Sequence, residues 1–275
     1  MRMLLGCDFS SAPSVRKPVT VAVGEACAGV VALHRIEEFR TLDAWQAWLA
    51  QQPAWVGAFD FPFGLPRELV QAWGWPTDWS ACMRQYAALD RAELRQRFRD
   101  FCAARPVGRK FAHRATDGPA GASPSMKWVH PPVAWMMHAG VPRLMALGAC
   151  FPGLGGMRPS PHVALEGYPG LLAREFLGRR SYKADDPVRQ SDARRQARAE
   201  LLAWLCEEGS TRLGLRLALS APECGRLMDE GSGDRLDAVL CLMQAAWAQA
   251  RTDSPGVGYG LPRSIDALEG WIVSA

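Results

Sequence analysis

A buried strand that ends in one acid is indicated by Ala54-Trp55-Val56-Gly57-Ala58-Phe59-Asp60. The chain continues as Phe61-Pro62-Phe63-Gly64-Leu65-Pro66, in which prolines and a glycine turn it away from the strand. A carboxylate at the tip of a buried strand is costly unless another group pairs with it. This stretch therefore predicts that Asp60 has a partner.

The same pattern occurs at two other places in the chain. Leu4-Leu5-Gly6-Cys7 leads into Asp8, and Val163-Ala164-Leu165 leads into Glu166. In α/β proteins, ligands gather beyond the carboxyl ends of parallel strands. The three acids are therefore predicted to meet at one edge of a sheet.

The order of apolar and amphipathic segments predicts an α/β fold. Strands are expected at 3–9, 18–23, 28–36 and 54–60, with a turn around Gly24-Glu25 and a helix that begins after an N-cap at Thr41. This helix should place the fourth strand parallel to the first. A fifth strand is expected at 161–166, and helical structure at about 66–104, 133–147, 168–178, 187–208 and 234–250.

One domain is expected for a chain of 275 residues of which 48% are hydrophobic. Its middle, at about 66–158, separates the fourth strand from the fifth and is predicted to be a mostly helical insertion. The eight cysteines include no Cys-x-x-Cys motif, which excludes a zinc knuckle or a thioredoxin-type motif. The first residues resemble neither a signal peptide nor a membrane span, so a cytoplasmic protein without membrane contact is expected.

The last predicted helix supplies two further acids, Asp234 and Asp237. At about 100° per residue, Asp237 lies at the edge of the apolar stripe of that helix, whereas Asp234 points more outward. We therefore expect Asp237 to reach the sheet edge. Asp234 either joins it there or caps the helix.

Several carboxylates at one sheet edge are typical of a site for two Mg²⁺ or Mn²⁺ ions, which promote in-line displacement at phosphorus. Each acid alone also has a structural explanation, such as capping a turn or pairing with an arginine. Together they predict a metal site whose catalytic residues are Asp8, Asp60, Glu166 and Asp237, with Asp234 as an additional metal ligand.

Four segments resemble the domain of unknown function family 429, which is described as predicted nucleases of the ribonuclease H-like fold. They are Gly6-Cys7-Asp8-Phe9-Ser10, Asp60-Phe61-Pro62-Phe63-Gly64-Leu65-Pro66, Glu166-Gly167-Tyr168-Pro169 and Asp234-Arg235-Leu236-Asp237-Ala238. The resemblance covers nearly the whole chain. It implies a mixed five-stranded sheet with three antiparallel strands first, and metal-dependent phosphodiester chemistry at the same acids. Many relatives carry a further acid where Gly170 stands here.

The middle of the chain is basic. From Arg91 to Arg114 the arginines and lysine exceed the acids by six charges, which suits a phosphate backbone but equally a solvated helix face. A loop rich in glycine and proline follows, with cations, a histidine and hydroxyls of the kind that a phosphate-bearing substrate requires. The predicted substrate-binding residues are Arg109, Lys110, His113, Arg114, Lys127 and Lys183.

These observations favour a metal-dependent nuclease or phosphodiesterase that acts on nucleic acid or another phosphodiester. Two alternatives use the same features. A phosphotransferase or ATP-binding protein of the same fold superfamily would need glycine-rich phosphate loops, which Ser10-Ser11-Ala12-Pro13 does not provide. A non-catalytic nucleic-acid-binding protein would need only the arginine-rich middle.

Overall fold

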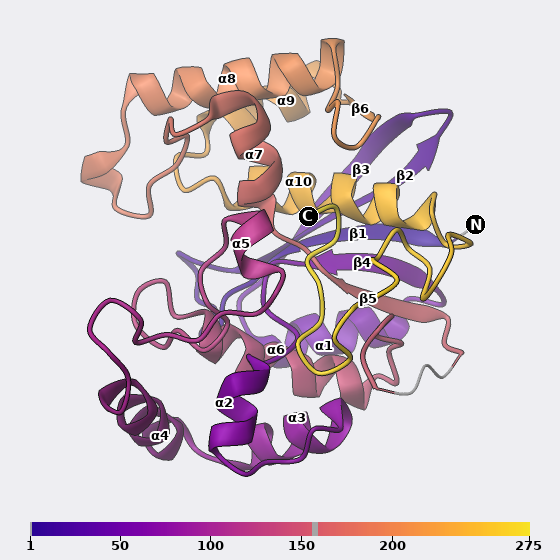
Figure 1. Ribbon diagram of the computed structural model, residues 1–275. Coiled ribbons are helices and arrows are strands. Elements are labelled where there is room, and N and C mark those ends of the chain that lie inside the picture. Colours follow the sequence, from indigo (N-terminus) through magenta and orange to yellow (C-terminus); the bar gives the residue numbers. More distant parts are fainter. Residues whose placement is uncertain (1, 156–158) are drawn as a thin grey trace.

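The computed structural model describes residues 2–155 and 159–275. Its core is one mixed sheet of six strands in the order β5-β4-β1-β2-β3-β6, with helices on both faces (Figure 1). Among the described residues, no helix combines the length and the apolar character needed to cross a membrane.

The centre of the sheet is β1 (Met3–Asp8), which is antiparallel to β2 (Val19–Cys27) and parallel to β4 (Trp55–Phe59). β3 (Val30–Phe39) continues the antiparallel ribbon, and α1 (Leu42–Gln51) crosses back to β4. The Thr41 side chain accepts a hydrogen bond from Ala44 N, which confirms the predicted N-cap. The predicted order of these five elements and the parallel pairing of β4 with β1 are also confirmed.

The turn between the second and third strands was misplaced by the sequence pattern. Gly24 and Glu25 lie inside β2, where the pairing register shifts, and the chain reverses at Ala28 and Gly29 instead. Both of these residues have positive φ, 49° and 79°. A glycine in an apolar alternation can mark a bulge as well as a turn, and here it marks a bulge.

The expectation of five strands is wrong, because the sheet has a sixth. β5 (His162–Glu166) is parallel to β4 as predicted, and β6 (Arg216–Ala218) adds to the opposite edge, parallel to β3. Only Leu217 of its three residues is buried. So short a strand has no alternation that a sequence pattern could detect.

Between β4 and β5 the chain forms helices, most of which pack with α1 below the sheet in Figure 1, whereas the short helix at 117–120 lies toward α7. The stretch 105–132, which separates the helices expected to end near 104 and to begin at 133, contains one short helix. The predicted end of the insertion at 158 lies outside the described residues. The helices are α2 (Arg67–Ala72), α3 (Trp79–Ala88), α4 (Arg91–Ala103), α5 (Asp117–Ala120) and α6 (Val133–Ala146).

The other face of the sheet is covered by the last helices of the chain (Figure 1). The helix expected at 187–208 is divided, because a 3₁₀ turn at Pro187–Arg189 ends before Ser191 caps the next helix. One helix, at 221–229, was not predicted. These elements are α7 (Pro169–Leu177), α8 (Asp192–Glu207), α9 (Ala221–Asp229) and α10 (Asp234–Gln249).

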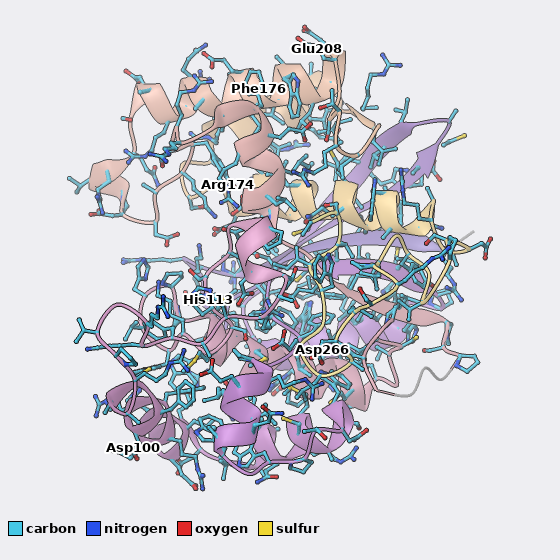
Figure 2. The ribbon with its side chains drawn as sticks, in the orientation of Figure 1. Asp100, His113, Arg174, Phe176, Glu208 and Asp266 are labelled. Atoms are coloured by element: carbon cyan, nitrogen blue, oxygen red, sulfur yellow. The ribbon has the colours of Figure 1, made fainter. Side chains whose placement is uncertain are left out.

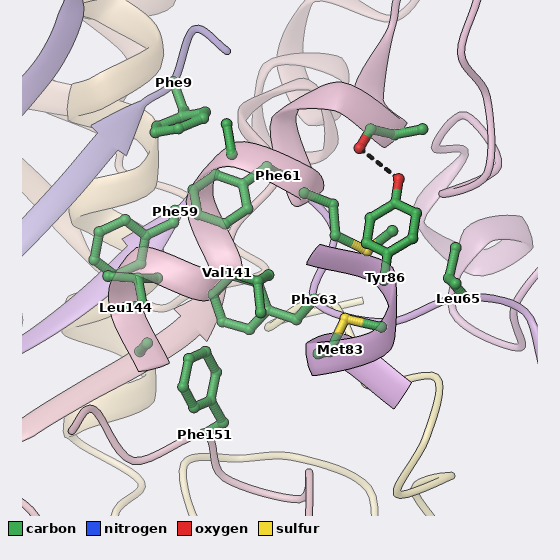
Figure 3. Close-up of a cluster of buried hydrophobic side chains, with 14 of the residues drawn as sticks. Phe9, Phe59, Phe61, Phe63, Leu65, Met83, Tyr86, Val141, Leu144 and Phe151 are labelled. Atoms are coloured by element: carbon green, nitrogen blue, oxygen red, sulfur yellow. Dashed lines mark hydrogen bonds between the residues drawn. The ribbon is translucent and has the colours of Figure 1, made fainter. Parts of the chain in front are cut away.

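Alternate residues of β1 contribute to two separate hydrophobic cores. Leu5 and Cys7 pack with α1 and the helices that follow β4, whereas Leu4 packs with α7 to α10. The first core is rich in aromatic rings, including Phe59, Phe61 and Phe63 (Figure 3). Both faces of the sheet are therefore buried at β1.

Gly6 allows α10 to lie directly against β1. A Cβ atom at residue 6 would stand 2.0 Å from Leu242 N and 2.1 Å from Ala238 O. Even alanine would force the helix away from the strand, because real Cβ atoms do not approach backbone atoms so closely. This contact fixes the position of α10, and hence of the acids in its first turn, relative to the end of β1.

Candidate functional site

The acids at the strand ends lie at the same end of the sheet, as predicted, but Glu166 belongs to a separate group of side chains there. Asp8 is the last residue of β1, Asp60 directly follows β4, and Glu166 is the last residue of β5. The register pairs Cys7 with Phe59, and Phe59 with Glu166. Asp8 and Asp60 therefore stand at the same level on adjacent parallel strands, and Glu166 lies one residue short of that level on the third strand.

The first turn of α10 brings two more acids to this edge. Asp237 is fully buried and Asp234 is 2% exposed. The expectation that Asp234 points outward is wrong, because the loop after β1 folds over it and places Lys17 Nζ 2.6 Å from its carboxylate. Asp234 is not the cap of the helix either, since Gly233 holds the N-cap position with φ of 77°.

We call Asp8, Asp60, Asp234 and Asp237 the acidic cluster. Two lysines lie against it. Lys17 binds Asp234 and the exposed Asp185, whereas Lys183 forms an ion pair with Asp237. Lys183 thus lies at the site, but it is paired with a carboxylate, and its predicted role in binding substrate stays a prediction. Tyr182 donates a second hydrogen bond to Asp237.

The positive charges of the two lysines do not balance the negative charges of the four carboxylates in the acidic cluster. Among the described residues, Oδ2 of Asp8 is buried without a hydrogen-bond partner. Burial raises the pKa of Asp8 well above its ordinary value, and the charges of Asp234 and Asp237 add to the rise. Burial and the charge of Asp237 raise the pKa of Asp60 to about 7. The cluster therefore favours either protons or a further cation.

Glu166 belongs to a second group, which we call the Arg114 cluster: Arg114, Asp117, Glu166 and Glu269. Arg114 grips both carboxylate oxygens of Glu166 at 2.7 Å, and its Nε and one terminal nitrogen bind Asp117 at 3.0 and 2.9 Å. Phe63 N donates a third bond to Glu166. Burial raises the pKa of Glu166, and Arg114 limits the rise.

Two predicted roles are corrected by this arrangement. Arg114 is 3% exposed and its guanidinium is occupied by carboxylates, so it is not a phosphate contact at the surface. Glu166 has its oxygens bound by Arg114 and Phe63, so it is not available as a metal ligand in this structure. The two residues that were assigned separately to phosphate and metal bind each other.

The Arg114 cluster also ties distant segments together. Arg114 donates to the Glu269 carbonyl, and the Glu269 carboxylate accepts from Ala115 N and Arg67 N. The Thr116 hydroxyl accepts from Ile272 N. The cluster joins the segment before α5 to the C-terminal segment, which is a structural task.

The other predicted substrate residues are not gathered at the acidic cluster. Arg109, Lys110 and His113 are exposed and Lys127 is half-buried, all on the segment between α4 and α6. Figure 2 shows His113 on this segment, away from α7. Their role in binding phosphate stays a prediction.

A pocket of about 260 Å³ adjoins the acidic cluster and was not foreseen from the sequence. Asp60 and Lys183 contribute to its lining together with Tyr168, Arg174 and Arg180. Three of these side chains come from α7 or the segment that follows it. Sequence spacing gave no signal for them, because the pocket forms only when this segment packs beside the end of β4.

The acidic cluster fits a hard divalent cation in its donor atoms. Carboxylate oxygens are the ligands that Mg²⁺ and Mn²⁺ prefer, and Asp8 holds one such oxygen without a partner. Within residues 2–155 and 159–275, however, no three His, Cys, Asp or Glu side chains are arranged as a ready metal site. Metal binding by Asp237 therefore requires Lys183 to move aside.

No protein-family model, curated protein or solved structure matches this chain. The resemblance to the domain of unknown function family 429 accordingly stays a prediction from the sequence.

Proposed function

We propose that the protein is a Mg²⁺- or Mn²⁺-dependent phosphodiesterase or nuclease, with its active site in the acidic cluster. The observation that carries the proposal is the buried, unpartnered oxygen of Asp8 among three further carboxylates. A buried anionic oxygen without a donor or a counter-ion is costly, and a bound cation would offset that cost. Two lysines against four carboxylates leave room for a divalent charge.

A ribonuclease H-like sheet is part of this proposal. It is supported by the three antiparallel strands β1, β2 and β3, with β4 and β5 parallel to β1 on its other side. The short β6 is an addition to the five strands that the resemblance implies. Fold alone does not establish activity, so the proposal depends on the acidic cluster.

The metal ligands are revised to Asp8, Asp60 and Asp237, with Asp234 held by Lys17 beside them. A bound Mg²⁺ or Mn²⁺ would help to generate hydroxide and would neutralise charge on the phosphate. Asp60 is the member of the acidic cluster that also lines the pocket, so it stands where a substrate would meet the site. Asp234 stabilises Lys17 and thereby keeps the loop after β1 over the acids.

Lys183 has a specific task in this proposal. Its side chain is 40% exposed, it pairs with Asp237, and it lines the pocket. Once released from Asp237, its ammonium can pair with a phosphate oxygen of the substrate. Tyr182 keeps its hydrogen bond to Asp237 and orients that carboxylate.

The test is cleavage of phosphodiesters by the full chain with Mn²⁺, with Mg²⁺ and with EDTA. Bis(p-nitrophenyl) phosphate and single-stranded and duplex oligonucleotides serve as substrates. We expect cleavage only with metal, and a loss of at least about 100-fold in Asp8→Asn and in Asp60→Asn, since each removes charge at the reacting centre. Asp185→Asn is the matched control, because Asp185 is exposed and lies at the rim of the cluster, where it pairs with Lys17.

Full activity in Asp8→Asn and Asp60→Asn would contradict the proposal, as would activity that persists in EDTA. Oligonucleotide binding that EDTA leaves unchanged, without cleavage under any metal, would select the non-catalytic alternative. Stabilisation by ATP with no cleavage of any diester would select the phosphotransferase or ATP-binding alternative.

A further inference from the structure

The pocket beside Asp60 combines a cationic side with an apolar side. Arg174, Arg180 and Lys183 supply the positive charge. Pro169, Ala173 and Leu177 supply apolar surface, and Tyr168 supplies an aromatic ring. A ligand that matches this lining carries a phosphate at one end and a flat ring at the other.

The aromatic part of the lining is held in position. The Arg174 guanidinium lies 5.1 Å from the centre of the Tyr168 ring, and it donates to the Tyr168 hydroxyl at 3.1 Å. Arg174 also donates to the Ala120 carbonyl, and the Tyr168 backbone N–H donates to Gln244. A ring that is fixed in this way can stack with a ligand at a small cost in side-chain entropy.

The charged part is less constrained. Arg180 is half-exposed and pairs with Glu200 on α8. Exposed arginines exchange a surface ion pair for a phosphate readily, because the surface pair contributes little. Arg180 is therefore the pocket cation that is most available to a ligand.

The size of the pocket limits what it can hold. Pockets for drug-sized ligands usually have about 300–1,000 Å³. At about 260 Å³, this pocket has room for one ring system and its phosphate, but not for a base pair within a duplex.

We propose that this pocket binds one unpaired nucleotide, with its base against Tyr168 and Leu177 and its phosphate toward Arg180 and Lys183. The inference rests on the proposed function in one respect: if the acidic cluster cleaves phosphodiesters, the bond that it cleaves adjoins this nucleotide. The substrate class is then a single-stranded end or a small nucleotide diester, and not the interior of a duplex.

The experiment measures equilibrium binding by calorimetry, separately with EDTA and with Ca²⁺, so that it does not depend on cleavage. The ligands are a nucleoside 5′-monophosphate, a 5′-phosphorylated single-stranded tetranucleotide and a blunt duplex of equal charge density. We expect the first two to bind and the duplex to bind at least about tenfold more weakly. Competition between the first two distinguishes a free nucleotide from a strand end as the preferred source.

Two pairs of variants test the lining. Arg180→Ala should weaken nucleotide binding about tenfold, whereas Arg179→Ala, next in the chain but outside the pocket lining, should leave binding unchanged. Tyr168→Ala should weaken binding by about tenfold or more, and Tyr168→Phe should retain most of it, because the stacking ring remains.

Failure of this inference is distinguishable from failure of the proposed function. Cleavage with Mn²⁺ but equal binding of duplex and single strand, or an equal loss in Arg179→Ala, would overturn the pocket assignment and leave the active site standing. Nucleotide binding with the expected variant pattern, but no cleavage, would overturn the proposed active site and leave the pocket assignment unaffected. No binding of any nucleotide with either EDTA or Ca²⁺ would also overturn the pocket assignment.

Discussion

The acidic cluster and the Arg114 cluster lie at the same edge of one sheet and differ in how their charges are matched. In the Arg114 cluster a single guanidinium binds two carboxylates, and backbone N–H groups bind the acids as well. In the acidic cluster the Asp8 carboxylate keeps an oxygen with no partner in the part of the chain that the structure describes. Both clusters begin with an acid at the tip of an apolar strand.

This difference shows which property of a buried acid points to function. Glu166 and Asp8 are almost equally buried, at 4% and 5% exposed. Glu166 is fully used in holding the fold together, whereas Asp8 retains the capacity to bind something else. Burial alone does not separate the two roles, and the hydrogen-bond inventory does.

The largest expected effect on stability comes from removing the cation of the Arg114 cluster. Arg114→Met leaves Asp117 and Glu166 buried without their cation, and should lower the free energy of unfolding by about 3–5 kcal/mol. Urea denaturation measures this. Arg109→Met, at an exposed arginine of the same segment, is the control and should change stability by less than about 0.5 kcal/mol. If Arg114→Met lowered the free energy of unfolding by less than about 1 kcal/mol, the structural role assigned to this cluster would be wrong.

A metal ion should stabilise the acidic cluster and leave the Arg114 cluster unaffected. At a Mn²⁺ concentration 100 times the dissociation constant, the free energy of unfolding should rise by about 2.7 kcal/mol, because the ion binds only the folded chain. Thermal and urea unfolding with and without Mn²⁺ measure the rise. Asp8→Asn should abolish it, and Asp185→Asn should preserve it. An equal rise in Asp8→Asn would place the ion elsewhere.

The pH dependence of stability sharpens the comparison further. The pKa of Asp60 is about 7 in the folded chain, above its ordinary value, so the folded state holds a proton that the unfolded state releases. Stability without metal should therefore fall as the pH rises from about 4 to about 7. In Asp60→Asn, the free energy of unfolding should fall by about 2 kcal/mol less over this pH range than in the unsubstituted chain. This figure is smaller than the free energy that corresponds to the whole pKa shift, because Asp60 is partly exposed and solvent screens its charge. An unchanged pH profile in Asp60→Asn would show that its carboxylate titrates normally.

The smallest effect is expected at the rim of the acidic cluster. Asp185 is 65% exposed and shares Lys17 with the buried Asp234. Asp185→Asn should cost less than about 1 kcal/mol, as exposed ion pairs do. Chemical denaturation of this variant beside Lys17→Met, which leaves Asp234 buried without its cation, should show the larger loss in Lys17→Met. The opposite order would mean that Lys17 serves Asp185 rather than Asp234.

The sequence was sufficient for the parts of the fold that local patterns encode. The strands at 3–9 and 54–60, the crossover helix after Thr41 and the placement of Asp8, Asp60 and Glu166 at one end of the sheet all follow from apolar runs and their ends. The short β6 did not, because three residues carry no periodicity.

Which cationic side chain pairs with which acid could not be predicted from the sequence, for a different reason. Arg114 and Glu166 are 52 residues apart, and Lys17 and Asp234 are 217 apart. Nothing local indicates which arginine reaches which acid, since that choice depends on how the loops pack. The helical wheel placed Asp234 on the outside for the same reason: it describes one helix and not the loop that covers it.

The contact at Gly6 has a consequence for how this protein can change over evolutionary time. Strand and helix touch there through main-chain atoms, so the distance between them does not depend on which side chains fill the neighbouring cores. Substitutions can accumulate in those cores while Asp8 and Asp237 keep their separation. Divergent descendants would then preserve the spacing of the two carboxylates even where little else in their sequences remains alike.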